Sequence, residues 1–158
     1  MKEVSWRRRL LSYSRGDNKV IGFLLGIVYG SFMEWGVHKM LFHEHGKKKN
    51  SPFAFHLRQH HADCIKNKYY DNQFSKREAL GVMFLLSIHM PIVLVSPPFY
   101  LALVIYGILF QILHSMGHRN PDWAKKYQPW HWRHHMETPN SNWNVVLPLA
   151  DWIMNTNK

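Results

Sequence analysis

The sequence has few of the features on which disulfide-stabilised domains, secreted proteins and common hydrolases depend. Cys64 is the only cysteine in 158 residues, which excludes an intrachain disulfide framework and an iron–sulfur cluster held by several nearby thiolates. No small-residue cleavage site follows the first apolar run, so we expect no secretory signal peptide. The sequence shows neither an obvious Ser-His-Asp set nor a carboxylate pair, so nothing in it suggests a hydrolytic site. At this length we expect a single domain with one core.

Acidic residues are also scarce, with ten Asp and Glu against twenty Lys and Arg and a formal net charge of +10. Such an excess suits either nucleic acid or an anionic membrane surface. The run from Lys47 to Lys49 is the best support for nucleic acid, but that interpretation explains neither the apolar runs nor the histidines of this chain. We therefore expect a membrane and a lipid as partners, and no nucleic acid.

Long apolar runs, in contrast, are present. The first covers residues 20–42 and is interrupted only by Glu34, His38 and Lys39 near its end. At 1.5 Å per residue it reaches roughly 34 Å, enough to cross a hydrocarbon core of about 30 Å. Residues 1–19 precede it and mix basic with apolar side chains, so we expect a basic amphipathic segment that lies on anionic headgroups.

The second apolar run extends from Ala79 to Leu113. As one helix it would measure roughly 52 Å, too long for a single crossing. Pro91, Pro97 and Pro98 interrupt it near the middle, where proline removes a backbone donor and breaks a helix. The run therefore predicts a helical hairpin with spans over about 79–95 and 98–114.

Together the runs predict an all-α, integral-membrane helical bundle with a histidine-rich polar cap. We expect one membrane domain over residues 20–158, with the cap formed by residues 43–78 and 115–158. If the first span ends near Phe42 and the hairpin returns to the same side, both parts of the cap lie at one membrane face.

Histidine is the residue that stands out, with twelve in the chain. Ten of them fall into four short groups, and positions three or four apart on a helix share a face. The pairs five apart spread over a wider arc and would need a frayed helix end or a metal between them. The four groups are His38 and His43; His56, His60 and His61; His114 and His118; and His131, His134 and His135.

Because the apolar pattern brings all four groups to one face, we expect these ten histidines to be metal ligands. Ten imidazoles exceed what one cation accepts, so we expect two metals, each with about five nitrogens and an open, catalytic position. Imidazole ligands alone do not identify the metal. Metals beside a lipid-facing bundle favour oxygen chemistry on a hydrocarbon chain, which two Fe ions can supply. Zinc as the occupant, in a non-catalytic zinc-binding membrane protein, stays open.

Some of the remaining polar residues could support this site. Four side chains could each accept the second ring N–H of a ligand histidine and so orient it. His45 is expected to be a polar loop residue, and His89 to be hydrogen-bonded near the break at Pro91. The four candidate orienting residues are Asp151, Glu34, Asp63 and Asn144.

The complete histidine pattern resembles the fatty acid hydroxylase superfamily of integral-membrane di-iron enzymes, which also contains sterol desaturases and carotenoid hydroxylases. Three further stretches strengthen the resemblance: EWGVHKMLFH around the first pair, the apolar hairpin between the second and third groups, and NWNVVLPLADWIMNT after the last. The resemblance extends from about Glu34 to Thr156.

This resemblance implies an O2-dependent oxidoreductase that inserts one oxygen atom into a C–H bond of a lipid, with a fatty acyl chain favoured. A lipid desaturase and a carotenoid or sterol hydroxylase are the alternatives within the superfamily. No electron-transfer domain is fused to the chain, so we expect electrons from a separate ferredoxin or cytochrome.

With three crossings, the basic segment 1–19 lies opposite the metal face. That face holds more Lys and Arg, eight in 43–78 and five in 114–158. The positive-inside rule then puts the active site in the cytoplasm. Alternatively, residues 20–33 only dip into the membrane, which leaves every basic segment on one side.

Overall fold

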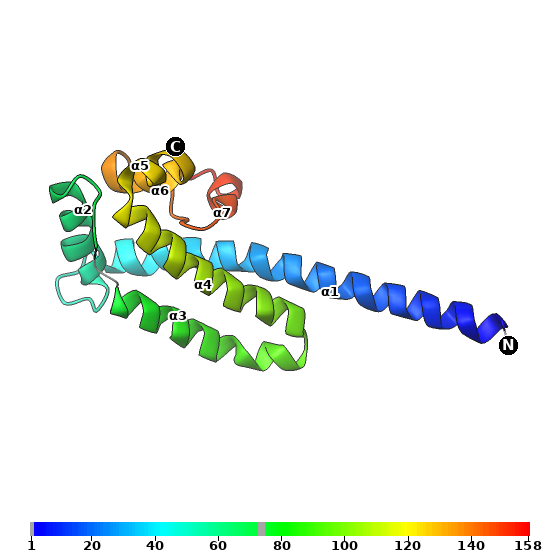
Figure 1. The fold of residues 1–158 in the computed structure, drawn as a ribbon. Coiled ribbons are helices and arrows are strands. Elements are labelled where there is room, and N and C mark those ends of the chain that lie inside the picture. Colours follow the sequence, from blue (N-terminus) through cyan, green and yellow to red (C-terminus); the bar gives the residue numbers. More distant parts are fainter. Residues whose placement is uncertain (1, 73–74) are drawn as a thin grey trace.

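The computed structural model describes residues 2–72 and 75–158, with side chains from Asn18 onward. Within these residues every regular element is a helix, which confirms the all-α class (Figure 1). The amphipathic character expected of residues 1–19 concerns side chains that, apart from Asn18 and Lys19, lie outside the described residues. The elements in order are α1 (Lys2–Gly36), the π-helices η1 (Val37–His45) and η2 (His56–His61), α2 (Ala62–Lys66), α3 (Lys76–His89), the 3₁₀-helix η3 (Met90–Leu94), α4 (Pro97–Arg119), α5 (Pro121–Tyr127), α6 (Pro129–Met136) and α7 (Leu149–Ile153).

Three helical stretches are long and apolar enough to cross a membrane: Asn18–His45, Lys76–Leu94 and Pro97–Arg119. They confirm the prediction of an integral-membrane bundle. The last of them continues past the expected end at residue 114, so that His118 lies on the same helix as His114. It ends at Arg119, before Asn120 and Pro121, because a residue that precedes proline is disfavoured in helical geometry. The division of the chain at residue 19 stays a prediction.

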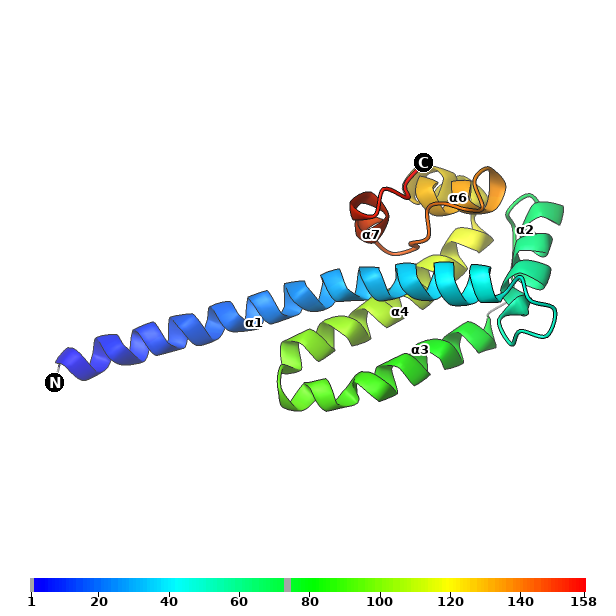
Figure 2. The same ribbon diagram turned by 180° about the vertical axis from the view of Figure 1, so that it is seen from behind.

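The hairpin turn follows from its prolines. Helix α3 ends at His89, and Pro91 sits in the first turn of η3, where its missing N–H leaves no hydrogen bond unmade. Helix α4 then begins with Pro97 in its first turn. The two helices return the chain to the side from which it came, as Figures 1 and 2 show.

Helix α1 packs closely on α4 through a stripe of glycines at four-residue spacing. A Cβ atom at Gly26 would lie 2.6 Å from the Cβ of Ala102 and from the carbonyl oxygen of Phe99, and one at Gly30 would lie 2.8 Å from the ring of Tyr106. Small residues at this spacing let two membrane helices approach each other. Gly22, which begins the stripe, faces Ser96 at the tip of the hairpin.

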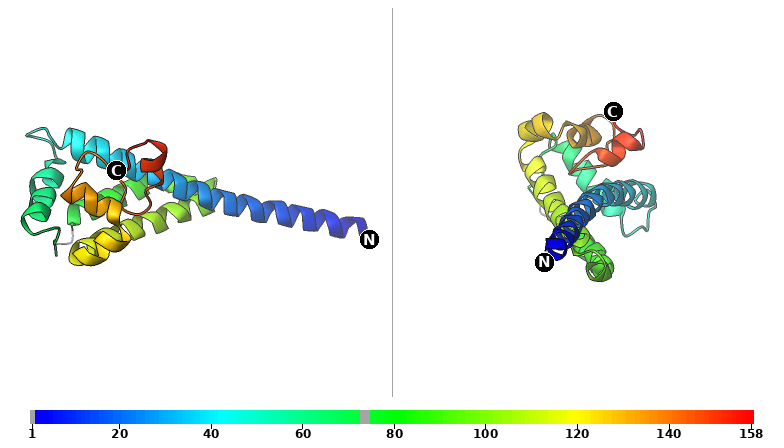
Figure 3. Two further views of the ribbon diagram at one scale, coloured as in Figure 1. Left: turned by 90° about the horizontal axis from the view of Figure 1, so that it is seen from above. Right: turned by 90° about the vertical axis from the view of Figure 1, so that its right-hand side faces the viewer.

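The remaining elements form the polar cap at the other end of the hairpin. Helix α2 lies beyond the end of η1, and α5, α6 and α7 lie on the opposite side of α1 and α4 from α3 (Figures 1 and 3). The N-terminal half of α1 extends past the hairpin tip, away from the cap (Figure 2). The four histidine groups therefore lie at one end of the bundle.

Candidate metal centre

Two π-helices resolve the five-residue spacing within the first two histidine groups. In a π-helix the hydrogen bond joins residue i to residue i+5, so residues five apart lie closer to one face than they do on an α-helix. The rings of His38 and His43 in η1 have centroids 5.1 Å apart, and those of His56 and His61 in η2 are 4.9 Å apart. A regular π-helical backbone thus replaces the frayed end that the sequence suggested. The π-helix is rare, and where it interrupts α-helices it is frequently found at functional sites.

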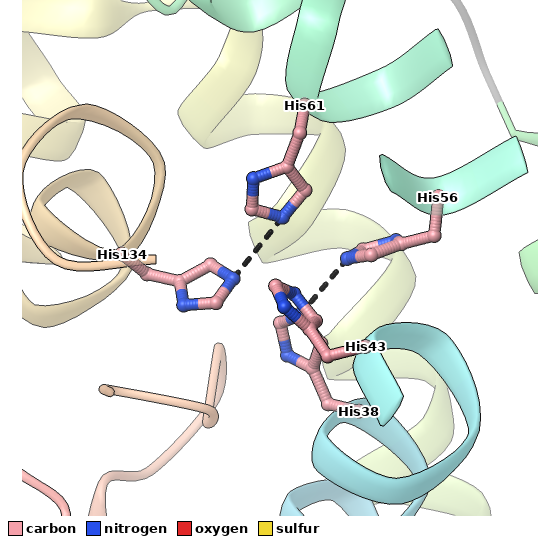
Figure 4. Close-up of side chains that lie close together, drawn as sticks. All are labelled: His38, His43, His56, His61 and His134. Carbon is pink, nitrogen blue, oxygen red and sulfur yellow. Dashed lines mark hydrogen bonds between the residues drawn. The ribbon is translucent and has the colours of Figure 1, made fainter. Parts of the chain in front are cut away.

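Five histidines form the first cluster. Each offers a ring nitrogen to a set whose members all lie within 4.8 Å of one another, and all five side chains are buried. Figure 4 shows the rings converging on one point from η1, η2 and α6. The Nε2 atoms of His38 and His56 lie 3.0 Å apart, and those of His61 and His134 lie 3.2 Å apart. The first cluster is His38, His43, His56, His61 and His134.

The second cluster lies against the first. It joins His60, His114, His118 and His135, again with ligand atoms within 4.8 Å of one another. His131 lies at its edge, outside the set of four, with its Nε2 3.4 Å from that of His118.

Neighbouring histidines divide between the clusters. His60 and His135 belong to the second cluster, whereas His61 and His134 belong to the first. Adjacent residues on a helix point about 100° apart. Each His-His pair therefore supplies one ring to each cluster and keeps the two clusters in contact, with the rings of His61 and His135 only 4.2 Å apart between centroids.

Backbone carbonyl groups orient several rings. The Nδ1–H of His134 donates to the carbonyl of Ser141 at 2.7 Å, that of His118 to Tyr69 at 3.1 Å, and that of His38 to Trp143. A carbonyl oxygen only accepts, so each Nδ1 carries the proton. The lone pair of each neutral ring is then on Nε2, which faces into its cluster, as is usual for histidines that bind metals.

Glu78, which the sequence pattern did not point to, places its carboxylate beside the Nδ1 atoms of two more rings. Its Oε1 lies 3.5 Å from Nδ1 of His56 in the first cluster, and its Oε2 lies 3.1 Å from Nδ1 of His114 in the second. The side chain is 3% exposed. In the sequence, Ser75 and Glu78 have the spacing of an ordinary helix N-terminus, and Ser75 does cap α3 by accepting from the Glu78 N–H. The sequence therefore does not indicate that the Glu78 side chain contacts histidines.

The arrangement suits bound cations. The Nε2 atoms of His114 and His118 face each other at 3.2 Å, and when both rings are neutral with their protons on Nδ1, each Nε2 carries a lone pair. Two facing lone pairs form no hydrogen bond, and a cation between them would satisfy both. Nε2 of His43 and both ring nitrogens of His135 are likewise buried without a hydrogen-bond partner in the described protein.

The protonation states agree with this role. Burial first, and then the charge of neighbouring histidines, holds the pKa of His56, His61, His131 and His135 well below the usual value. The pKa of His134 is lowered by burial and by the same kind of neighbours. These rings are neutral at pH 7, as metal ligands must be.

Two of the expected orienting residues, Asp151 and Glu34, instead bind the loop of residues 143–145. Asp151 accepts from the backbone N–H groups of Trp143 and Asn144 at 3.0 and 2.8 Å, and thereby holds the loop whose Trp143 carbonyl orients His38. Glu34 accepts from the N–H of Val145 at 2.7 Å and from the Asn144 side chain. Both carboxylates therefore hold the backbone of residues 143–145 and contact no histidine ring directly among the hydrogen bonds of the described residues.

The other polar residues lie further away. His45 is exposed, and Asp63, on α2, is half-buried. Asp71, which the sequence analysis did not select, places Oδ2 3.5 Å from Nδ1 of His60. His89 is hydrogen-bonded close to the Pro91 break, with Nδ1 2.7 Å from the carbonyl of Leu85.

An apolar cavity of about 240 Å³ extends from the clusters between α1, α3 and α4. His38, His56 and His114 contribute to its wall at the metal end, and most of the remaining lining is aliphatic or aromatic. An apolar chain in this cavity would have its nearest carbons beside both clusters.

Comparison with known proteins supports the resemblance seen in the sequence. The family whose description is Fatty acid hydroxylase matches residues 23–156. No curated protein and no solved structure matches the chain.

Proposed function

The chain belongs to the fatty acid hydroxylase family, and from that premise we propose that it is a di-iron oxygenase that hydroxylates the acyl chain of a lipid. Membership implies a membrane oxidoreductase with hydroxylase or desaturase activity on a lipid, in a family that is typically di-iron. The acyl chain, the choice of hydroxylation and the iron ions are our proposal.

One observation carries the proposal: a set of five imidazoles and a set of four with His131 beside it, nine of the ten rings buried, meet at one end of an apolar cavity. With His131 counted in the second set, each set leaves room for one further ligand on a six-coordinate metal. When bound, a pair of iron ions would supply the oxygen-activating chemistry that an unactivated C–H bond requires. One atom of O2 enters the C–H bond, and the other leaves as water with two electrons and two protons from outside.

The ten clustered histidines are the proposed ligands, and the rest of the chain holds them in place. Glu78 lies 3.1 Å from Nδ1 of His114 and 3.5 Å from Nδ1 of His56, so its one carboxylate would orient both rings with Nε2 turned inward. The carbonyls of Tyr69, Ser141 and Trp143 do the same for one ring each. The apolar wall of the cavity binds the hydrocarbon and keeps water from the reacting carbon.

We propose that the metal centre faces the cytoplasm and receives electrons from a separate ferredoxin or cytochrome. The cap carries thirteen Lys and Arg over residues 43–78 and 114–158, and both segments lie at the same end of the bundle (Figure 1). Residues 20–33 run beside α4 along the glycine stripe, which supports a crossing rather than a shallow dip.

Expression in a host followed by mass spectrometry of its lipids tests the proposal. Hydroxylation adds one oxygen atom to an acyl chain, whereas desaturation removes two hydrogens, so a loss of two hydrogens would assign the alternative activity. Metal analysis of the purified protein belongs to the same experiment. Zinc with no lipid product under reducing, aerobic conditions would contradict the proposal and favour a non-catalytic zinc protein.

A further inference from the structure

The apolar cavity has a polar pair at the end remote from the histidine clusters. Tyr29 on α1 and His89 on α3 both line it. The Tyr29 hydroxyl lies 2.8 Å from Nε2 of His89, within two candidate membrane spans. An ionisable side chain at membrane depth usually marks a site of function, because its burial in lipid is unfavourable.

The hydrogen bonds of the two side chains indicate which atom of this pair can accept a hydrogen bond from a ligand. Nδ1 of His89 lies 2.7 Å from the carbonyl of Leu85, so Nδ1 carries the proton of the neutral ring. Nε2 is then an acceptor, and the Tyr29 hydroxyl donates to it. The Tyr29 oxygen keeps its own lone pairs, and the pair presents an acceptor to the cavity.

The ligand that fits this acceptor is a neutral hydrogen-bond donor. Among the described residues that line the cavity there is no Lys or Arg, so nothing there would neutralise a carboxylate or a phosphate. A ketone offers no proton to the Tyr29 oxygen. A hydroxyl group provides the missing donor and is uncharged.

The helix geometry gives the distance from this pair to the metal end. Tyr29 precedes His38 on one continuous helical stretch, and His89 follows Glu78 on α3. At 1.5 Å per residue both separations are roughly 15 Å. A substrate that reaches both ends is therefore elongated.

We propose that Tyr29 and His89 form a subsite for a hydroxyl group of the lipid substrate, roughly 15 Å from the carbon that is oxidised. The inference rests on the proposed function, since it assumes that the cavity holds the substrate. It narrows the substrate class to elongated lipids that already carry a hydroxyl group, and it makes the pair a determinant of which carbon meets the metal centre.

Binding of matched lipids to the purified protein tests the subsite. Hexadecanoic acid is compared by calorimetry with its ω-hydroxy and mid-chain hydroxy derivatives, in detergent and without oxygen. One hydroxylated isomer should bind about 3- to 10-fold more tightly than the parent, as expected for one additional hydrogen bond. Tyr29→Phe should abolish that advantage and leave the affinity for hexadecanoic acid unchanged.

Tyr100→Phe is the matched control, because the Tyr100 hydroxyl donates to the carbonyl of Leu86 and Tyr100 is not part of the cavity wall. It should leave the preference intact. The subsite is ruled out if no isomer binds more tightly than the parent, or if Tyr29→Phe weakens all the acids equally, as a mere link between helices would. Product analysis in the same preparation separates the two proposals: a hydroxyl preference without any oxygenated product contradicts the proposed function alone, and turnover without a preference contradicts the subsite alone.

Discussion

Helices α3 and α6 differ in what they bury, and the contrast extends to the two ends of the molecule. Among the described side chains of α3, Glu78 alone is buried, while apolar residues such as Leu80, Met83 and Phe84 are more than 60% exposed. Helix α6 in the cap buries His131, His134 and His135. The hairpin is thus apolar outside, and the cap is polar inside.

This contrast shows that the two ends are stabilised differently. In lipid, exposed apolar side chains are not penalised, and close helix packing and satisfied backbone groups hold the hairpin together. The cap depends on buried polar groups, and each one that is left without a hydrogen-bond partner or a metal costs about 1–3 kcal/mol. Changes in the cap should therefore affect metal and activity, and changes in the hairpin should affect helix packing or nothing.

The largest effect is expected from removing a histidine of the cap. His134→Ala should release metal from the first cluster and reduce turnover to background, because the remaining rings leave a ligand position unfilled. The α-helical circular dichroism of the spans should stay close to that of the unchanged protein. Iron content per chain and lipid analysis measure the two effects.

His45→Ala is the control for that variant, since His45 is exposed and outside both clusters. It should keep metal and turnover. Hydroxylation by His134→Ala at the normal rate would show that the ligand assignment is wrong.

A smaller but specific effect is expected at the carboxylate that joins the clusters. Glu78→Gln replaces one of two acceptors with an amide that cannot accept from both rings, so metal affinity should fall about 10- to 100-fold. Chelator titration with a colorimetric readout measures the loss. Glu44→Gln, on an exposed residue paired with Lys47, should leave affinity unchanged. Equal affinities in the two variants would exclude an orienting role for Glu78.

Substitutions in the glycine stripe of α1 test how the hairpin end is packed. Gly26→Ala places a methyl group against Ala102 and the Phe99 backbone, so α1 and α4 must separate, at about 1–3 kcal/mol of stability. Metal content per folded molecule should not change. Thermal unfolding in detergent measures the shift. Gly36→Ala meets nothing within 4 Å and should change stability by less than about 0.5 kcal/mol, and a comparable loss in both variants would contradict the packing argument.

The smallest effect is expected on the lipid-facing surface. Leu94→Ala, at a residue that is 86% exposed, should change stability by less than about 0.5 kcal/mol. The same substitution at Leu103, which is 8% exposed on α4, should cost about 2–5 kcal/mol. Similar losses at both positions would mean that the exposed face of the hairpin packs against something other than lipid.

Much of this arrangement could be predicted from local patterns. Apolar run length and the prolines at 91 and 97 predicted the three candidate spans and the hairpin, and the return of the chain predicted that the histidine groups share one face. The convergence of the ten histidines into two adjacent sets agrees with that expectation, and their role as ligands stays a proposal. Such features follow from sequence because run length, proline geometry and charge act within one segment.

Other features depended on contacts between distant segments. The division of neighbouring histidines such as His60 and His61 between clusters required the full packing of α2, α4 and α6 around η2. The carbonyls of Ser141 and Trp143 could not be predicted to orient histidine rings, because every residue has a backbone carbonyl. In the sequence Glu78 is typical of a helix N-terminus, and only the tertiary structure shows that His56 and His114 lie beside its carboxylate.

Sequence by itself therefore determined which residues meet the membrane and which imidazoles gather at one face, since periodicity and hydropathy are properties of a single stretch of chain. Tertiary structure alone decided how the rings are shared, which atoms orient them and where the cavity leads, since these depend on distances between segments far apart in the chain.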